Sequence, residues 1–169
     1  MLMSVAELIE MIDLEKDMDK LFRWYQNGHS RNLPEIMTAA LRQAIRLKAG
    51  EFDPEDDFEN SVFHALAGYE VALGIKNEGR TAGTQARNLL KLLKPVDAIK
   101  FLVNSKDKKF GLVTLTSMHL AEFTVESVVV TYPERFLPEQ VLEAQRRLDA
   151  IFEKCPKDFI YPEIEHNIF

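Results

Sequence analysis

The segment FGLVTLTSMHLAEFTVESVVVTY, residues 110–132, decides the fold class of this chain. Its valines and threonines favour a β-strand by intrinsic propensity. Between Ser117 and Phe123, however, no Gly, Pro, Asn or Asp is present to turn a β-hairpin. On a helical wheel the segment is apolar almost all round, which is typical of a helix buried at the centre of a bundle. We therefore predict a buried central helix near residues 112–131 and an all-α fold.

Capping residues and apolar periodicity predict further helices on both sides of this segment. Ser4 opens the first helix, which is expected to run to Asn27-Gly28, with a break near Asp13 as an alternative. Proline suits the first helical position and marks three other starts. They are Pro34, Pro54 (within Asp53-Pro54-Glu55, the strongest start) and Pro138. Two shorter helices are expected at residues 86–93 and 96–103.

The length and composition indicate one domain. A chain of 169 residues and 19.4 kDa fits a single hydrophobic core, and its loop-like stretches are short. We predict a single-domain bundle of about six to seven helices over residues 1–169, with an extended tail at 154–169. The composition, 46% hydrophobic and 28% charged, excludes a disordered or low-complexity chain.

Three features of the sequence favour a cytoplasmic location. No apolar stretch approaches the ~20 residues that a membrane span requires. The first residues lack the basic and apolar regions of a secretory signal. Cys155 is the single cysteine, so an internal disulfide is excluded and a reducing compartment is favoured.

The net charge of −6 conceals blocks of opposite charge. Residues 51–75 hold seven acidic side chains and no basic one, and residues 76–109 hold nine basic against three acidic. Such a basic block can bind an anion or a nucleic acid, or dock onto an acidic block such as residues 51–59. Its candidate contact residues are Arg80, Arg87, Lys91, Lys94 and Lys100. A pI of about 5.3 and the lack of aromatic residues within the stripe disfavour a dedicated nucleic-acid-binding protein.

Two motifs suggest catalytic chemistry and are weakened by their context. Gly74–Thr81 has nearly the spacing of a phosphate-binding loop, but Arg80 replaces the lysine and a helix rather than a strand precedes it. His119, Glu122 and Glu126 fall within about 60° of one another on a helical wheel, as metal ligands of a helical bundle do. No matching Glu-x-x-His pair is found on another predicted helix, so we expect neither a metal nor another cofactor.

The last residues of the chain are too apolar for a free end. They either pack over the bundle or insert into another molecule. The candidate partner-contact residues in this tail are Phe159, Ile160, Tyr161, Ile168 and Phe169.

The spacing of eleven residues along the chain resembles that of uncharacterised bacterial helical proteins. They are Gly79, Arg80, Ala98, Phe110, Gly111, Thr124, Glu126, Pro133, Phe136, Ala144 and Arg146. The resemblance implies neither a family name nor an activity.

Three hypotheses for the function follow from these observations. The first is a non-catalytic cytoplasmic protein that acts through protein–protein contacts, with itself as a homo-oligomer or with another protein. The second is a nucleic-acid-binding protein that uses the basic segment 76–109. The third is a metal-dependent enzyme that uses the His/Glu strip.

Overall fold

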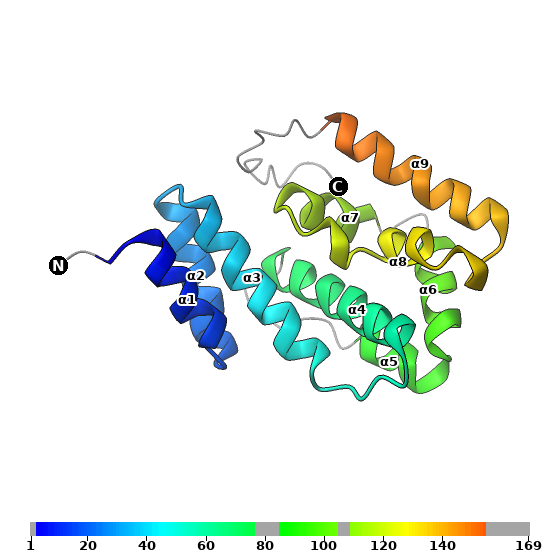
Figure 1. Ribbon diagram of the computed structural model, residues 1–169, viewed down its shortest axis with the longest axis horizontal. Helices are drawn as coiled ribbons and strands as arrows, with labels where there is room; N and C mark the ends of the chain where they lie inside the picture. The colour runs from blue at the N-terminus through cyan, green and yellow to red at the C-terminus, as the bar shows by residue number, and fades with distance from the viewer. Residues whose placement is uncertain (1–2, 77–84, 105–108, 155–169) are drawn as a thin grey trace.

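The computed structural model describes residues 3–76, 85–104 and 109–154, which are helical with no β-strand (Figure 1). The all-α class predicted from residues 110–132 is therefore confirmed. The helices are α1 Val5–Leu14, α2 Met18–Ser30, α3 Pro34–Ala49, α4 Asp57–Lys76, α5 Gln85–Leu92, α6 Pro95–Asn104, α7 Lys109–Ser117, α8 Val125–Thr131 and α9 Pro138–Lys154. Two short 3₁₀ turns, η1 Ala121–Phe123 and η2 Pro133–Arg135, precede and follow α8.

The described residues thus form nine α-helices rather than the six to seven that we predicted. The first predicted helix is two helices, because the chain ends α1 at Leu14 and Asp17 then caps α2. The Asp17 carboxylate accepts hydrogen bonds from the backbone N–H groups of Asp19 (2.9 Å) and Lys20 (3.2 Å). This cap lies four residues beyond the expected break at Asp13.

The prediction of one central helix over residues 112–131 is wrong. The chain breaks at His119, which adopts a left-handed backbone conformation (φ 56°). The Leu120 N–H donates to the Leu115 carbonyl (2.8 Å) and the His119 N–H to that of Thr116 (3.1 Å), the paired bonds of a Schellman helix end. Thr124 then caps α8 by accepting a hydrogen bond from the Ser127 N–H (3.2 Å). A helix can therefore end here without a glycine.

The central helix of the described structure is α4. It packs against α3 on one side and against α5, α6, α7, η1 and α8 on others. Its buried residues lie on several faces, since Val62 and Leu66 pack in one hydrophobic cluster and Val71 and Ala72 in another. The predicted start at Asp53 is displaced, because Asp56 accepts a hydrogen bond from the Glu59 N–H (2.8 Å) and α4 begins at Asp57.

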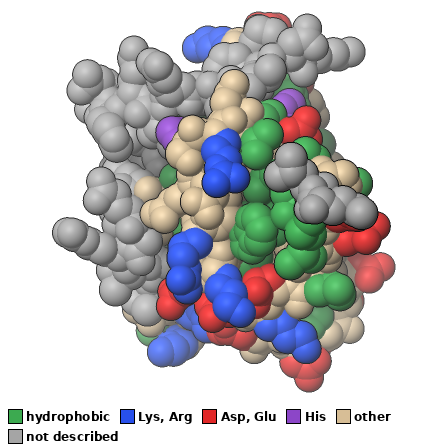
Figure 2. Space-filling view, turned by 90° about the vertical axis from the view of Figure 1, so that its left-hand side faces the viewer, with side chains coloured by type: hydrophobic (Ala, Val, Ile, Leu, Met, Phe, Trp, Pro, Cys, Tyr) green, Lys and Arg blue, Asp and Glu red, His purple; other side chains and the backbone are tan. Residues whose placement is uncertain are grey.

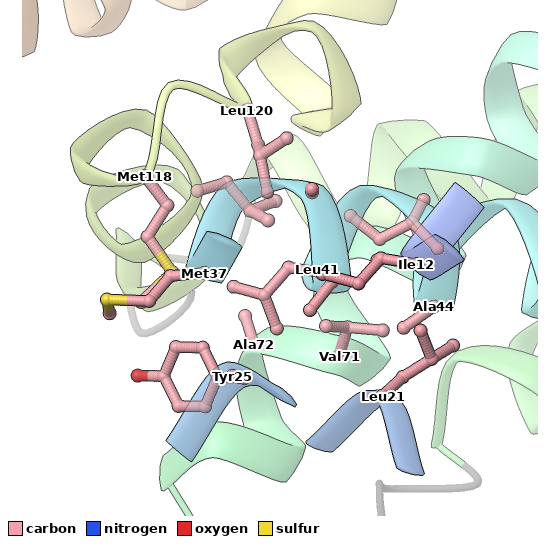
Figure 3. Packing of buried hydrophobic residues seen from close by; sticks show 14 of the residues in the cluster. Ile12, Leu21, Tyr25, Met37, Leu41, Ala44, Val71, Ala72, Met118 and Leu120 are labelled. Carbon is pink, nitrogen blue, oxygen red and sulfur yellow. The ribbon is translucent and has the colours of Figure 1, made fainter. Parts of the chain in front are cut away.

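The first hydrophobic cluster joins α1, α2 and α3 to the second half of α4 (Figure 3). Ile12 from α1, Leu21 from α2, Leu41 from α3 and Val71 from α4 meet there, all 0–1% exposed. Gly28 lies inside α2, which continues to Ser30, and does not end the helix as predicted. A Cβ at this position would lie 2.8 Å from the Met37 Cγ on α3. Glycine allows the close approach of these two helices.

The second cluster joins the first half of α4 to α6, α8 and α9. Phe58, Ile99, Val129 and Ala144 are among its buried residues. Figure 1 shows the resulting arrangement, with α1–α3 at one end of the molecule, α4 in the middle and α9 along an outer edge. Pro34, Pro95 and Pro138 each begin a helix.

Candidate functional site

The predicted basic residues divide between an internal ion-pair cluster and the surface. Arg87 on α5 forms ion pairs with Glu51 and, through Nε at 3.3 Å, with Glu70 on α4. The Glu70 side chain is 4% exposed, and Lys48 Nζ on α3 lies 3.3 Å from its second carboxylate oxygen. Hydrogen bonding to Arg87 lowers the pKa of Glu51 and raises that of Arg87. Arg87 therefore docks onto the acidic block, the alternative that we raised against nucleic-acid binding.

A shallow groove of about 460 Å³ lies beside this cluster. Phe52 and Phe63 stack in its wall with ring centroids 4.8 Å apart, and the Arg87 guanidinium lies 5.5 Å from the Phe52 ring centre. Asp53, Leu90, Lys91 and Pro95 complete the lining. Arg87 and Lys91 thus come together here.

The other predicted basic residues do not join Arg87 and Lys91 in the groove lining. Lys94 is exposed and Lys100 is partly buried. Arg80 lies outside the described residues. No single continuous cationic stripe can therefore be assigned from the described part of the chain.

The three residues of the predicted metal strip point to different surroundings. His119 is exposed at the helix break, and Glu122 is exposed and pairs with Arg42 on α3 (3.4 Å). Glu126 is 2% exposed and pairs with Arg147 on α9 (3.4 Å). The strip was expected on one continuous helix, and the break at His119 removes that geometry. Among the described residues no three His, Cys, Asp or Glu side chains come close enough to hold a metal ion.

Glu126 lines a small cavity between α4, α6, α7 and α8. Burial raises the pKa of this carboxyl, and Arg147 opposes the shift. The cavity is about 10 Å³, close to the least volume that can hold one water molecule, and Tyr69 and Leu115 also line it. A substrate has no room beside Glu126, so we interpret the Glu126–Arg147 pair as a structural link between α8 and α9.

The predicted partner-contact tail, Phe159, Ile160, Tyr161, Ile168 and Phe169, lies outside the described residues. So does the rest of the extended tail that we predicted at 154–169, except Lys154, which ends α9. The Gly74–Thr81 motif begins within α4, and its remaining residues after Lys76 are outside as well.

The sequence reasoning missed an exposed apolar surface on α1 and α2. Leu14 is 80% exposed, Met11 50% and Met3 49%. Leu8 on α1 and Trp24 on α2 are partly buried against the first cluster. We call these five residues the α1–α2 face. Figure 2 shows hydrophobic side chains gathered in a band on this end of the molecule.

The sequence carried an ambiguous signal in this region. The apolar residues of the first predicted helix fall on two opposite sides, a pattern that indicates either a break in the helix or contacts with two partners. The break between α1 and α2 accounts for most of it, since Leu21 and Tyr25 on the second side are buried in the first cluster. Within α1, Ile12 is fully buried against the core, and Leu14 projects away from it.

Comparison of the chain with protein-family models, curated proteins and solved structures gives no match. In the described part of the chain, no helix has both the length and the apolar character needed to cross a bilayer.

Proposed function

We propose that this protein acts through protein–protein contacts, in the cytoplasm, and has no catalytic activity of its own. The observation that carries the proposal is the α1–α2 face. A monomer rarely exposes several large apolar side chains side by side, because each costs free energy in water, and such patches mark interaction sites. Within the α1–α2 face, Leu14, at 80% exposed, gains most from a partner.

The buried charged groups also support the proposal that the protein has no catalytic activity. Glu70 is held by Lys48 and Arg87, and Glu126 by Arg147. A general acid or base must reach a substrate. In the described part of the chain, Glu126 lines a cavity of about 10 Å³, and Glu70 is not among the residues that line the groove beside Arg87. Both carboxylates instead link helices that are distant in the sequence.

Site-specific photo-crosslinking tests this proposal in the cells that make the protein. A benzoyl-phenylalanine in place of Met11 should form a covalent adduct with a protein, because Met11 lies on the α1–α2 face. The same probe at Leu142 on α9, which is 73% exposed, is the matched control and should form little or none. Equal yields at the two positions, or no adduct at Met11, would contradict the proposal.

Nucleic-acid binding is a second candidate, favoured by the exposure of Lys91 and Lys94 on α5 and after it. The probes are a labelled DNA duplex and a labelled RNA of the same sequence, titrated at several salt concentrations. If this candidate is right, Lys91→Glu weakens binding and lowers the slope of log affinity against log salt by about one, and Lys154→Glu does neither. Absence of binding, or an equal effect of the two variants, would contradict nucleic-acid binding through Lys91.

A further inference from the structure

We propose that the partner of the α1–α2 face is a second copy of this chain, docked about a twofold axis that runs parallel to α1 and α2. The inference rests on the proposed function and names its partner. A twofold interface brings the same surface together from both copies, so the surface must be complementary to itself. The α1–α2 face meets this condition in its charges and in its apolar centre.

The charges on the two sides of the face are opposite. All four ionisable residues of α1 and its C-cap are acidic: Glu7, Glu10, Asp13 and Glu15. On α2 the exposed Lys20 and Arg23 stand beyond the acidic first turn formed by Asp17 and Asp19, so the lysine or arginine of α2 farthest from the turn between the helices is Arg23. Figure 2 shows Lys and Arg mostly on one flank of the hydrophobic band and acidic groups on the other, with acidic and basic groups together at the lower end of the band. An axis along the band places the acidic flank of each copy on the basic flank of the other.

Glu10 and Arg23 lie at matching heights along the two helices. Glu10 is six residues before Lys16, at the turn between the antiparallel helices, and Arg23 is seven residues after it. At about 1.5 Å per residue, a twofold axis parallel to the helices brings these two side chains level across the interface. The opposite choice, an axis across the helices, would set α1 against α1 and acid against acid.

Glu10 and Arg23 are also available to pair. Within the described structure neither forms an ion pair, and Arg23 only donates from Nε to the Asp19 carbonyl of its own helix (3.3 Å). Neighbouring charges are already engaged, Glu15 with Lys20 (3.5 Å) and Asp13 with Arg46 (3.8 Å).

Met11 marks the centre of the interface. It lies about 100° around α1 from the buried Ile12, whereas Glu10 lies about 200° around. The proposed axis places the Met11 side of α1 toward α2. Met11 therefore lies next to the axis and packs on its own copy, with the Glu10–Arg23 pairs outside it.

The test is the mass of the purified full chain by light scattering over a dilution series. We expect twice 19.4 kDa for the wild-type protein, falling toward 19.4 kDa on dilution. Leu14→Glu should give 19.4 kDa throughout. Leu142→Glu, at a leucine on α9 that is 73% exposed against 80% for Leu14, should keep the wild-type mass. A wild-type monomer at every concentration, or a dimer that Leu14→Glu leaves intact, overturns the inference.

A charge exchange tests the orientation. Glu10→Arg and Arg23→Glu should each raise the dimer dissociation constant about 5-fold or more, since like charges then face each other. The double variant restores the opposite-sign pairs and should return the constant to within about 2-fold of wild type; additive loss overturns the proposed axis.

The two proposals can fail separately. A monomeric purified chain whose Met11 probe captures a different protein in cells overturns the second copy and leaves the proposed function standing. Failure of crosslinking at Met11 in cells counts against the proposed function itself.

Discussion

Arg147 pairs with two carboxylates whose pKa values move in opposite directions. Its Nε lies 2.9 Å from Glu143 and its Nη1 3.4 Å from Glu126. Hydrogen bonds from Arg146 and Arg147 lower the pKa of the partly exposed Glu143 to about 2. Burial raises the pKa of Glu126, because the loss of hydration outweighs the attraction of Arg147. Exposure to water decides the direction for each carboxyl.

These opposite shifts predict opposite effects of pH. Because the folded-state pKa of Glu126 is raised, its contribution to the free energy of unfolding is lost as pH rises from about 4.5 through that pKa. Glu126→Gln stays neutral, so its stability relative to wild type should increase across this window and then stay constant. Melting temperatures measured from pH 4 to 8 check this.

Glu143→Gln is the control, with the reverse sign. The stability from Glu143 is present above its ordinary pKa of 4.5 and is lost as pH falls toward 2, so this variant should be the less stable one near neutral pH. The effect should be small, because Glu143 is partly exposed to solvent and Arg146, one of its two partners, is exposed. A stability difference for Glu126→Gln that does not change with pH would contradict the interpretation.

Arg87 is expected to matter for stability more than its neighbours on α5. Arg87→Ala removes a charged partner from the buried Glu70 and leaves Lys48 as its remaining partner in the cluster. We expect a loss of about 1.5–3 kcal/mol in the free energy of unfolding by urea, the usual worth of a hydrogen bond to a charged group. Lys91→Ala, on the same helix and exposed, should change it by less than about 0.5 kcal/mol. Equal losses would show that the cluster is not a stabilising contact.

Among the elements, the helix end at His119 places a side chain with a Cβ in the left-handed region. A β-branched residue tolerates this conformation poorly, so His119→Val should cost about 1–2 kcal/mol. His119→Gly relieves the same strain and should be close to neutral, because it also gains freedom in the unfolded chain. Urea unfolding of both variants compares them. A Val variant as stable as the Gly variant would mean that the left-handed conformation at position 119 carries no strain.

Helix starts could be predicted from the sequence where one residue decides them locally. Ser4 forms a capping box with Glu7, as an isolated helix would, and Pro34 and Pro138 begin α3 and α9. The start of α4 was misplaced because several acids in a row can all act as caps. In the structure Asp56, not Asp53, accepts the hydrogen bond of the first turn, from the Glu59 N–H.

Helix ends and the interaction surface depend more on tertiary structure. Gly28 does not end α2. Its lack of a side chain instead makes room for Met37 of α3. His119 ends α7 because Leu120 and Leu115 are both buried there, a contact that no local rule anticipates. Likewise, the apolar sides of α1 are visible in the sequence, but only the position of α3 shows which side remains exposed.

For the whole molecule, the close contact of α4 with η1 is a sensitive point. A Cβ at Gly68 would lie 2.8 Å from the Phe123 carbonyl oxygen, a backbone atom that cannot move alone. Gly68→Ala should therefore lower the free energy of unfolding by about 1–3 kcal/mol, as overpacking does. Gly111→Ala is the matched comparison, because its Cβ meets the movable ring of Tyr69 at 3.1 Å, and its loss should be smaller. A Gly68→Ala variant as stable as wild type would mean that η1 is loosely attached.

Ion pairs in the folded structure join blocks of opposite charge along the chain. Arg46 pairs with Asp13, Arg87 with Glu51, and Arg42 with Glu122. The alternation therefore serves, in part, to hold together helices that are separated in the sequence.

The placement of α4 in both hydrophobic clusters has a consequence for how the native state opens. Residues of α4 belong to both hydrophobic clusters, so unfolding of α4 would disrupt both at once. The two halves of the molecule are therefore coupled through this helix. Amide protons in the middle of α4, near Val62 to Val71, should exchange with deuterated solvent only when the whole chain unfolds. Those of α1, attached mainly to α3, should exchange through smaller, local openings.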